Sequence, residues 1–451
     1  MKVKASLILM GSVLMLTGCP ILDDDDDPKG ESKLRVTHAS SDAPFVAIKL
    51  NGDVVDGLDM VDYQVGSGLL TLDSGTYDVV VEAQLTGDET LDVITANLDL
   101  APDMQYDIFA VNNTDDIAPV VLSREDVAPG SDEVRLDVLH AHPGVGGVDI
   151  YLTTAESIDG EDPAIENLEF TIDSADLPVT VPADTYRIRI TLAGDKGVAF
   201  DSGDLPLAGG SDLMISAVPN VDGGVVSPVN LLVADGDAVN VLKSVGEKAT
   251  VRVVHAVGDV APLPVDVLAS GAKIADEFNN ILFPEFRSLD VDAGSYDLSV
   301  ASSDDNSLVV IEAPGTEFAA GSETSIYAMG KLNDVVSETI EPVVYEEDLR
   351  SVATYAKVRV VHANTFAGKV DVHASADGMF SESTVVLEAV DFTQSAVLNV
   401  PEGTYQLAVT ATGDLMPLIQ GAATVADGGV YTVVALEDLT FGINVDTEPS
   451  E

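Results

Sequence analysis

A short stretch, Leu34-Arg35-Val36-Thr37-His38-Ala39, recurs three more times and constrains the fold more than any other feature of this chain. The other copies are Asp137–Ala141, Val251–Ala256 and Val358–Ala363. From one histidine to the next, the distances are 102, 115 and 107 residues, far longer than a solenoid repeat and close to the size of a domain. The repeat therefore predicts four tandem domains.

Two further landmarks follow each copy in the same order. A turn ends in a tyrosine 39 to 46 residues after the histidine, and an apolar strand begins 26 to 29 residues after that tyrosine. The histidines are His38, His140, His255 and His362, and the tyrosines are Tyr77, Tyr186, Tyr296 and Tyr405. Three landmarks in one order, four times over, set the register of the repeats.

Strand signals dominate every repeat. β-Branched residues alternate with polar ones, and Gly, Asp, Asn or Pro interrupts the pattern about every ten residues. In the third copy, Val251, Val253 and His255 share one face of a strand, and Arg252 and Val254 share the other. About seven short strands per repeat predict an all-β protein of four tandem immunoglobulin-like β-sandwich domains.

The first residues have the pattern of a targeting signal. Lys2 and Lys4 precede an apolar run, Ala5–Leu16, that is too short to span a bilayer. Leu16-Thr17-Gly18-Cys19 then resembles a bacterial lipobox, which implies that Cys19, the single cysteine of the chain, carries acyl chains such as palmitate and anchors the mature protein. The alternative is a plain secretory peptide with an incidental cysteine.

The predicted segments follow from these landmarks. They are a signal peptide (1–18), an acidic tether (19–33) and sandwich repeats at 34–130, 131–248, 249–355 and 356–451. Charge repulsion keeps the Asp23–Asp27 run extended, as a spacer or a surface-export signal. By resemblance to enterobacterial lipoprotein sorting rules, Pro20 in place of an aspartate after Cys19 implies the outer membrane, facing either the periplasm or the surface. Because the joins between repeats are short and polar, we expect beads on a string with modest interfaces.

Charge excludes one class of partner. With 77 acidic and 21 basic residues the formal net charge is −56, which repels the phosphate backbone of nucleic acid. Apolar residues still make up 46% of the chain and fall in strand-sized blocks, so the composition is that of a folded protein.

The repeated histidines invite a catalytic interpretation, which requires an acid, nucleophile or metal that recurs with them. Asp149, Asp266 and Asp371 are candidate acids on the next strand, but the first repeat has Ala47 there. We therefore predict that each histidine is structural and caps a strand end by bonding to a loop. The repeated tyrosines are likewise predicted to be structural, as tyrosine corners whose hydroxyls bond to backbone upstream.

Metal ligation is the other chemistry to weigh. His140 and His142 lie two apart on one strand face, the spacing of a shared metal site, yet that repeat has no further histidine and no cysteine. Asp201–Asp204, Asp235–Asp237 and Ser303–Asn306 are oxygen-rich loops of the kind calcium prefers, but a chain this acidic contains such clusters by chance. We predict no metal and no cofactor, with calcium as the alternative.

The repeated motifs resemble a family of bacterial lipoproteins built from domain of unknown function 4397. The second copy departs from the pattern, since Asp137 stands where Arg35, Arg252 and Arg359 stand and Asp184 replaces the glycine of the turn. The resemblance implies a secreted or surface-anchored β module and brings no known activity.

Together these observations predict a lipid-anchored cell-envelope protein that is not an enzyme. Phosphate-binding, serine-hydrolase and zinc-protease motifs are absent from the sequence. Repeated modules suit surface binding, adhesion or envelope scaffolding, with a protein or glycan partner at the domain-end loops. A calcium-dependent adhesin and an envelope hydrolase are the alternatives.

Overall fold

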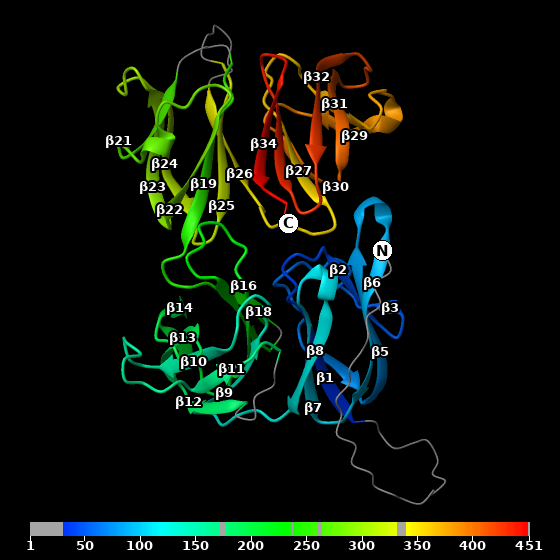
Figure 1. Cartoon of the computed structure of the whole chain (residues 1–451), viewed down its shortest axis with the longest axis vertical. Coiled ribbons are helices and arrows are strands. Elements are labelled where there is room, and N and C mark those ends of the chain that lie inside the picture. The colour runs from blue at the N-terminus through cyan, green and yellow to red at the C-terminus, as the bar shows by residue number, and fades with distance from the viewer. Residues whose placement is uncertain (1–29, 172–176, 237, 259–263, 332–339, 450–451) are drawn as a thin grey trace, which may run out of the picture.

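The structure is a computed structural model that describes residues 30–171, 177–236, 238–258, 264–331 and 340–449. The predicted signal peptide (1–18) and Cys19 lie outside these residues, as does the predicted tether up to residue 29. The last residues of that tether, 31–33, already belong to the first strand, Glu31–His38. The described chain forms eight sheets, two in each repeat, that face each other as four β-sandwiches (Figure 1). The predicted all-β fold of four tandem immunoglobulin-like domains is confirmed. No helix within the described ranges is long and apolar enough to cross a membrane.

Sandwiches 1 and 2 each pair their first strand, in parallel, with the strand that carries the third landmark. Sandwich 1 has the sheets β4-β1-β7-β8 and β3-β2-β5-β6. Its strands are β1 (Glu31–His38), β2 (Val46–Leu50), β3 (Asp53–Val54), β4 (Leu70–Asp73), β5 (Gly75–Gln84), β6 (Thr90–Leu100), β7 (Met104–Val111) and β8 (Ala118–Glu125). Sandwich 2 has the sheets β12-β9-β16-β17-β18 and β11-β10-β13-β14, with β15 beside β13. Its strands are β9 (Glu133–His140), β10 (Val148–Thr153), β11 (Ile165–Leu168), β12 (Val179–Pro182), β13 (Asp184–Leu192), β14 (Val198–Asp201), β15 (Leu205–Leu207), β16 (Asp212–Pro219), β17 (Val229–Asp235) and β18 (Ala238–Leu242).

Sandwiches 3 and 4 repeat the arrangement of sandwich 1. Their sheets are β22-β19-β25-β26 with β21-β20-β23-β24, and β30-β27-β33-β34 with β29-β28-β31-β32. The strands of sandwich 3 are β19 (Lys248–His255), β20 (Val265–Ala269), β21 (Ala272–Lys273), β22 (Phe286–Asp292), β23 (Gly294–Ser302), β24 (Val309–Phe318), β25 (Glu323–Met329) and β26 (Glu341–Glu346). Those of sandwich 4 are β27 (Ala356–His362), β28 (Val370–Ser375), β29 (Val385–Val390), β30 (Ser395–Val400), β31 (Gly403–Ala411), β32 (Pro417–Val425), β33 (Val430–Ala435) and β34 (Phe441–Thr447).

Short elements complete the sandwiches. The described part of the chain has four 3₁₀ turns, at Thr86–Asp88, Thr114–Asp116, Asp276–Phe278 and Glu382–Thr384. The described residues of the four sandwiches hold eight, ten, eight and eight strands, where the sequence predicted about seven each. Two-residue edge strands such as β3 and β21 account for part of the difference, because so short a run shows no alternation of apolar and polar residues.

The strand with the repeated histidine is buried on both faces. In β19, Val251 and Val253 enter the core between the two sheets of sandwich 3. Val254, on the opposite face, enters a second core shared with sandwich 4. A solvated outer face would expose polar residues to water, whereas this face buries Val254 together with Arg252.

Neighbouring sandwiches therefore pack face to face, and the expectation of beads on a string is wrong. Sandwiches 1 and 2 share a core of Ala39, Tyr63, Phe109, Val111, Leu122, Leu139, Ala141, Met214, Val218, Leu232 and Ala234. Sandwiches 3 and 4 share a core of Val254, Ala256, Tyr327, Met329, Val361, Ala363, Val434 and Leu436. Each pair is thus a stack of four sheets with three apolar layers between them. The short polar joins wrongly indicated separate domains, because the surfaces that pack together lie on the strands and not in the joins.

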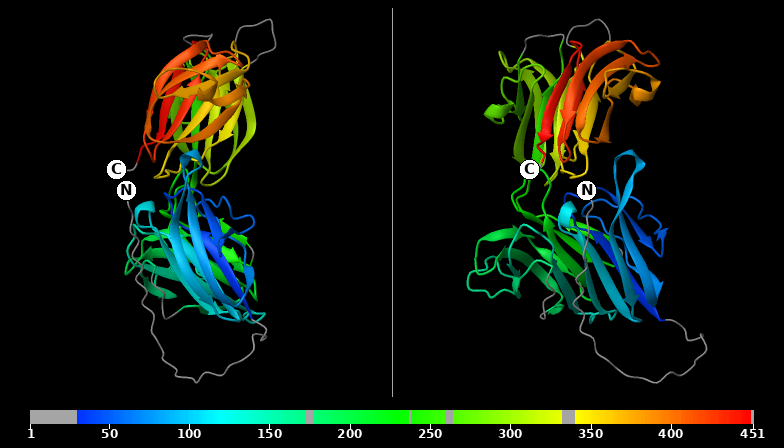
Figure 2. Two further views of the ribbon diagram at one scale, coloured as in Figure 1. Left: turned by 90° about the vertical axis from the view of Figure 1, so that its right-hand side faces the viewer. Right: turned by 45° about the vertical axis from the view of Figure 1, so that its right-hand side comes forward.

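The two pairs are stacked end to end (Figures 1 and 2). We call the end of a sandwich where its repeated histidine lies the histidine end, and the other, with the repeated tyrosine, the tyrosine end. The histidine end of sandwich 1 meets the tyrosine end of sandwich 4, where the Ala353 amide donates to the Asp42 carbonyl (2.8 Å). The histidine end of sandwich 2 meets the tyrosine end of sandwich 3, where the Gly224 amide donates to Thr250 Oγ1 (2.8 Å).

Candidate functional site

The repeated histidines fasten loops at the strand ends. Nε2 of His38, His140 and His362 lies 2.8–3.1 Å from the carbonyl oxygen six residues later, at Pro44, Gly146 and Gly368 respectively. In all four repeats Nδ1 accepts the amide N–H two residues later, including that of Val257 for His255. An imidazole engaged in this way holds the loop in a fixed turn and has no free nitrogen for catalysis in the three repeats with both bonds.

Burial favours the neutral imidazole at three of these histidines. It lowers the pKa of His38 to about 4 and also lowers the pKa values of His140 and His362. Each repeated histidine also meets an aromatic ring edge-on, with centroids 6.0–6.3 Å apart. These partners, Tyr63, Phe170, Phe283 and Phe392, lie on loops 25 to 30 residues after their histidines, a fourth recurring landmark that the sequence analysis missed.

The spacing of His140 and His142 does not produce a shared metal site. Both nitrogens of His140 are occupied by backbone groups of the following loop, and His142 Nδ1 accepts the Gly144 amide at 3.2 Å. Within the described ranges, no three His, Cys, Asp or Glu side chains gather as metal ligands do.

The aspartates of the second strand do not pair with the histidines. Asp149 accepts the amides of Asn167 and Gly194, both at 2.8 Å. Asp371 accepts those of Ala389 and Gly413 at the same distance. These hydrogen bonds hold the pKa of Asp371 below its usual range. The aspartate therefore anchors two loops, and the suggested acid–histidine pair is wrong.

The repeated tyrosines form one contact four times. Each hydroxyl donates to the carbonyl four residues earlier, at Asp73, Pro182, Asp292 and Pro401, over 2.7–3.0 Å. That bond fastens the turn before the tyrosine strand, as in a tyrosine corner. In sandwich 2 the bond forms although Asp184 replaces the glycine.

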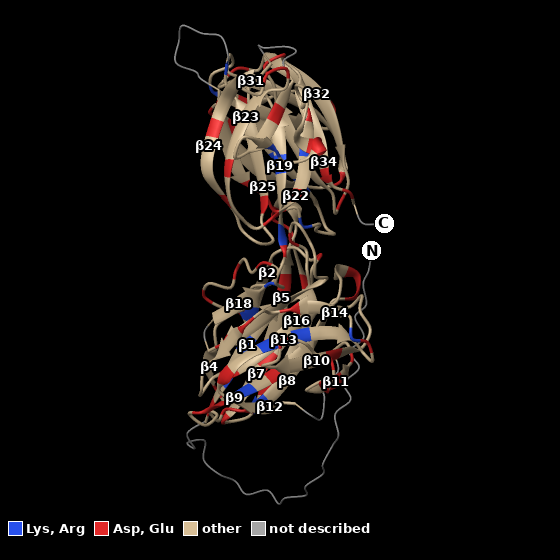
Figure 3. Cartoon of the chain, turned by 90° about the vertical axis from the view of Figure 1, so that its left-hand side faces the viewer, with Lys and Arg blue, Asp and Glu red and all other residues tan. Residues whose placement is uncertain are grey.

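The acidic loops considered for calcium already have partners. Asp201 accepts from Arg189 Nε at 3.0 Å and from Arg187 Nε at 3.2 Å. Ser303 and Asn306 instead donate hydrogen bonds to the buried carboxylate of Asp266. Asp237 lies outside the described residues. Acidic positions greatly outnumber basic ones on both pairs (Figure 3), in line with the net charge.

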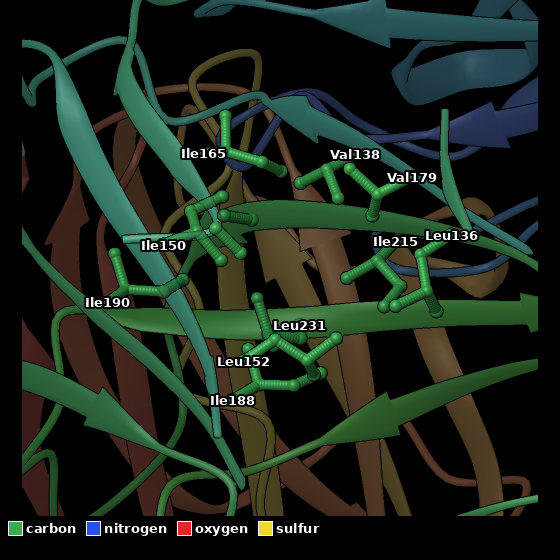
Figure 4. A pocket seen from close by; sticks show the side chains of 12 residues that line it. Leu136, Val138, Ile150, Leu152, Ile165, Val179, Ile188, Ile190, Ile215 and Leu231 are labelled. Carbon is green, nitrogen blue, oxygen red and sulfur yellow. The ribbon is translucent and has the colours of Figure 1, made fainter. Parts of the chain in front are cut away.

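A small apolar cavity lies between the sheets of sandwich 2 (Figure 4). Its volume is about 30 Å³, enough for about one water, and every described residue that lines it is aliphatic. Leu136 and Val138 of β9, Ile150 of β10 and Leu231 of β17 point into it. Without a polar group to orient a ligand, this space is a packing gap in the core.

Buried charges occupy the face between sandwiches 1 and 2. Arg35 and Arg124 of sandwich 1 both pair with Asp107, at 2.6 and 2.7 Å. Arg124 also lies 3.4 Å from Asp212 and 3.5 Å from Asp137, both in sandwich 2. The unusual Asp137 is thus an acid facing an arginine across the interface, which explains why this repeat departs from the arginine pattern.

The same face between sandwiches 3 and 4 uses the repeated arginines differently. Arg252 pairs with Asp446 and, at 2.9 Å, with Glu347. Arg359 reaches the other oxygen of Glu347 at 2.5 Å. In both pairs the repeated arginine position is a structural contact between sandwiches.

Exposed apolar side chains gather at the histidine end of sandwich 4. Three loops, 363–369, 412–416 and 436–440, are tied together there, and we call them the distal loops. The Thr412 amide donates to the Lys369 carbonyl (3.2 Å), and Asn364 Nδ2 donates to the Leu436 carbonyl (2.7 Å). The exposed side chains are Phe366 (67%), Leu415 (48%), Met416 (73%) and Leu439 (54%). This is the candidate binding site.

The histidine end of sandwich 1 is equivalent to the distal loops of sandwich 4, but the second pair of sandwiches covers it. There the guanidinium of Arg350 donates to the carbonyls of Ser41 (3.2 Å) and Ala43 (2.8 Å) from the second pair. The distal loops have the same place in their own sandwich, and none of the described sandwiches covers them. A cation from sandwich 3, the Lys331 ammonium, lies 3.8 Å from the centre of the Phe366 ring.

Four all-β sandwiches, packed in pairs through the sheets that contain the repeated histidine strands, make this a modular protein built from one repeated domain. The chain belongs to the family described as "Domain of unknown function (DUF4397)", whose model matches residues 32–151 and 249–373. Each match begins at the first strand of an odd-numbered sandwich and ends inside the partner with which that sandwich packs.

Similarities to other proteins are weak. The Bacillus anthracis TIE protein is 10% identical with a TM-score of 0.14, and the alignment covers 87% of this chain and 65% of that one. A variant of BcpA, the major pilin subunit of Bacillus cereus, is 11% identical with a TM-score of 0.14, over 69% and 99% of the two chains. No curated protein matches the chain.

Proposed function

We propose that this protein is a non-catalytic, lipid-anchored stalk of the cell envelope that presents the distal loops for binding or adhesion. The observation that carries this proposal is the polarity of the stack. The described chain starts at Gly30, at the tyrosine end of sandwich 1, where the Ser74 amide donates to the Gly30 carbonyl. The distal loops lie at the opposite end of the molecule (Figure 1).

Attachment through Cys19 would then set the distal loops as far from the membrane as the body allows. The interfaces within the two pairs make each pair stiff, since each pair shares a continuous apolar core. Phe366 and Met416 suit a partner with an apolar face, because burying exposed apolar area is the main favourable term in association. We therefore favour a protein partner over a glycan.

The location of the protein is tested by a protease experiment on intact cells. A protease that cannot cross the membrane is applied, and the full-length band is followed by immunoblot. Loss of the band places the sandwiches outside the cell, where adhesion is the leading role. Survival until the outer membrane is opened places them in the periplasm, in which case an envelope scaffold replaces adhesion. The Cys19→Ser variant should move to the soluble fraction.

The binding role is tested with the double variant Phe366→Ser/Met416→Ser. We expect cells that display it to adhere to an apolar polystyrene surface at least several-fold less than cells with the native protein. The control is Val127→Ser/Val344→Ser, which alters two side chains that are also more than half exposed (59% and 52%) but lie elsewhere. Equal adhesion of all three strains would exclude the distal loops as the binding site.

A further inference from the structure

A cavity of about 360 Å³ lies where the two pairs of sandwiches meet. Its described lining contains six carboxyl groups and one arginine. They are Asp62 and Asp222 from the first pair, and Glu323, Glu346, Glu347, Asp348 and Arg350 from the second. So many acids at one interface raise the question of how each negative charge is compensated.

Most of these acids have a cation close by. Asp62 pairs with Arg350 at 2.5 Å, Asp222 pairs with Lys243 at 3.0 Å, and Asp348 pairs with Lys357. Glu347 is shared by the two arginines of the interface between sandwiches 3 and 4. Glu346 is exposed to solvent.

Glu323 differs from the other five. Its side chain is largely buried at the start of β25, and it forms no ion pair with any described residue. Among the described residues, its carboxyl group accepts a hydrogen bond from the Leu349 amide, which donates to Oε2 at 2.6 Å. Burial, opposed by this bond and reinforced by the charges of Asp348 and Asp222, raises its pKa to about 7.

The first pair closes directly over this side chain. A Cβ added at Gly223 would lie 2.6 Å from Glu323 Cγ, so the loop backbone of sandwich 2 fits here only because residue 223 is glycine. The Gly223 amide donates to the Gly321 carbonyl at 3.3 Å. Opening the junction would therefore expose Glu323 to water.

The junction is able to open because the pairs have a single covalent connection. The short segment 243–247 joins β18 to β19, while the other joins, 126–132 and 347–355, lie within the pairs. Across the junction the remaining ties are hydrogen bonds and the Arg350 contacts, with no apolar core of the size found within each pair.

We propose that this junction is a proton-controlled hinge: it is closed while Glu323 is protonated and opens when the ionised side chain is repelled by Asp222 and Asp348. The charged groups around Glu323 are Asp222 and Lys243 of sandwich 2, Asp62 of sandwich 1, Lys248 of β19, Glu346 of β26, Glu347, Asp348 and Arg350 of segment 347–355, and Lys357 of β27.

The direction of the pH effect follows from linkage. In the open state the carboxyl group returns to its ordinary pKa of 4.5, whereas in the closed state its pKa is about 7. The closed state therefore binds the proton more tightly. Its advantage is complete below pH 4.5 and is lost as the pH rises to 7, so the opening constant grows by roughly tenfold or more between pH 5.5 and 8.

The test is small-angle X-ray scattering of the full chain carrying Cys19→Ser, which removes the expected acylation site, at pH 5.5 and pH 8. We expect the radius of gyration to increase at pH 8. Glu323→Gln, which is neutral at both pH values, should stay compact. Glu346→Gln, at an exposed position of the same cavity, should respond as the native chain does.

A second measurement covers the case in which Glu323→Gln does not fold. Hydrogen exchange of the native chain, corrected for intrinsic rates, should show protection of the Gly223 and Gly224 amides lost at pH 8, while β9 and β16 keep theirs. A radius and an exchange pattern that do not change with pH would overturn the hinge. So would a Glu323→Gln variant that opens like the native chain.

Discussion

At the scale of single residues, this protein repeats one device, in which a buried or half-buried polar side chain holds a loop by its backbone. His362 bonds to two backbone groups of its loop, Asp371 to two amides and Tyr405 to one carbonyl. Buried polar groups are costly unless bonded, so each of these residues enforces one loop conformation. That explains their recurrence without catalysis.

The lowered pKa of the buried His38 predicts how the free energy of unfolding depends on pH. The unfolded chain takes up a proton at His38 near pH 6.5, whereas the folded chain resists until about pH 4. Stability is therefore lost as the pH falls through this range, by about 2 kcal/mol for this histidine between pH 7.5 and 5. Urea midpoints of the native chain and of His38→Gln should differ at pH 7.5 and converge by pH 5. A constant difference would contradict the assignment of a neutral, buried His38.

At the scale of the element, the histidine strand is the unit that builds the molecule. One face of the strand enters its own sandwich and the other enters the neighbouring one, so each strand contributes to two cores. The polar positions on the outer face set which sandwich fits which. In sandwich 2 the acid Asp137 meets Arg124, whereas sandwich 4 presents Arg359 to Glu347.

Replacing Asp137 by the arginine that the other repeats have at this position should therefore destabilise the protein. Asp137→Arg would remove an acceptor of Arg124 and add a cation to a buried face, and we expect a loss of about 3–5 kcal/mol, typical of a broken buried ion pair. Glu133→Arg, at an exposed position of the same strand, is the control and should have little effect. Urea denaturation of both variants measures the loss. If the two variants are equally stable, the face between sandwiches 1 and 2 is not closed to water.

At the scale of the whole molecule, two stiff pairs are stacked by a small junction. Arg350 is its main clasp, since its guanidinium bonds to Asp62 and to two carbonyls of sandwich 1. The stacking gives the molecule a tether end and a free end, on which the proposed stalk depends.

Removing the clasp should loosen the stack without unfolding the sandwiches. Arg350→Met keeps the apolar stem and deletes the guanidinium, so we expect a larger radius of gyration with an unchanged circular dichroism spectrum. Arg287→Met is the control, because its ion pair with Glu285 lies within sandwich 3. If Arg350→Met scatters like the native chain, other contacts hold the pairs together.

Much of the fold could be predicted from local patterns in the sequence. Strand alternation, turn residues and three ordered landmarks were enough to predict four sandwiches, because these signals act within a few residues or recur at domain spacing. Some of the tyrosine and histidine contacts were accessible for the same reason, since their partners lie four and six residues away.

The arrangement of the sandwiches was decided by the tertiary structure. Arg350 meets the Ala43 carbonyl 307 residues away, and Gly223 meets Gly321 across two different sandwiches. Such contacts depend on the fit of whole surfaces, for which no short spacing is a signal. By itself the sequence determined what each repeat becomes. Only the tertiary structure decided how the repeats pair and stack, because burial of the outer sheet faces and compensation of their charges are properties of two sandwiches together.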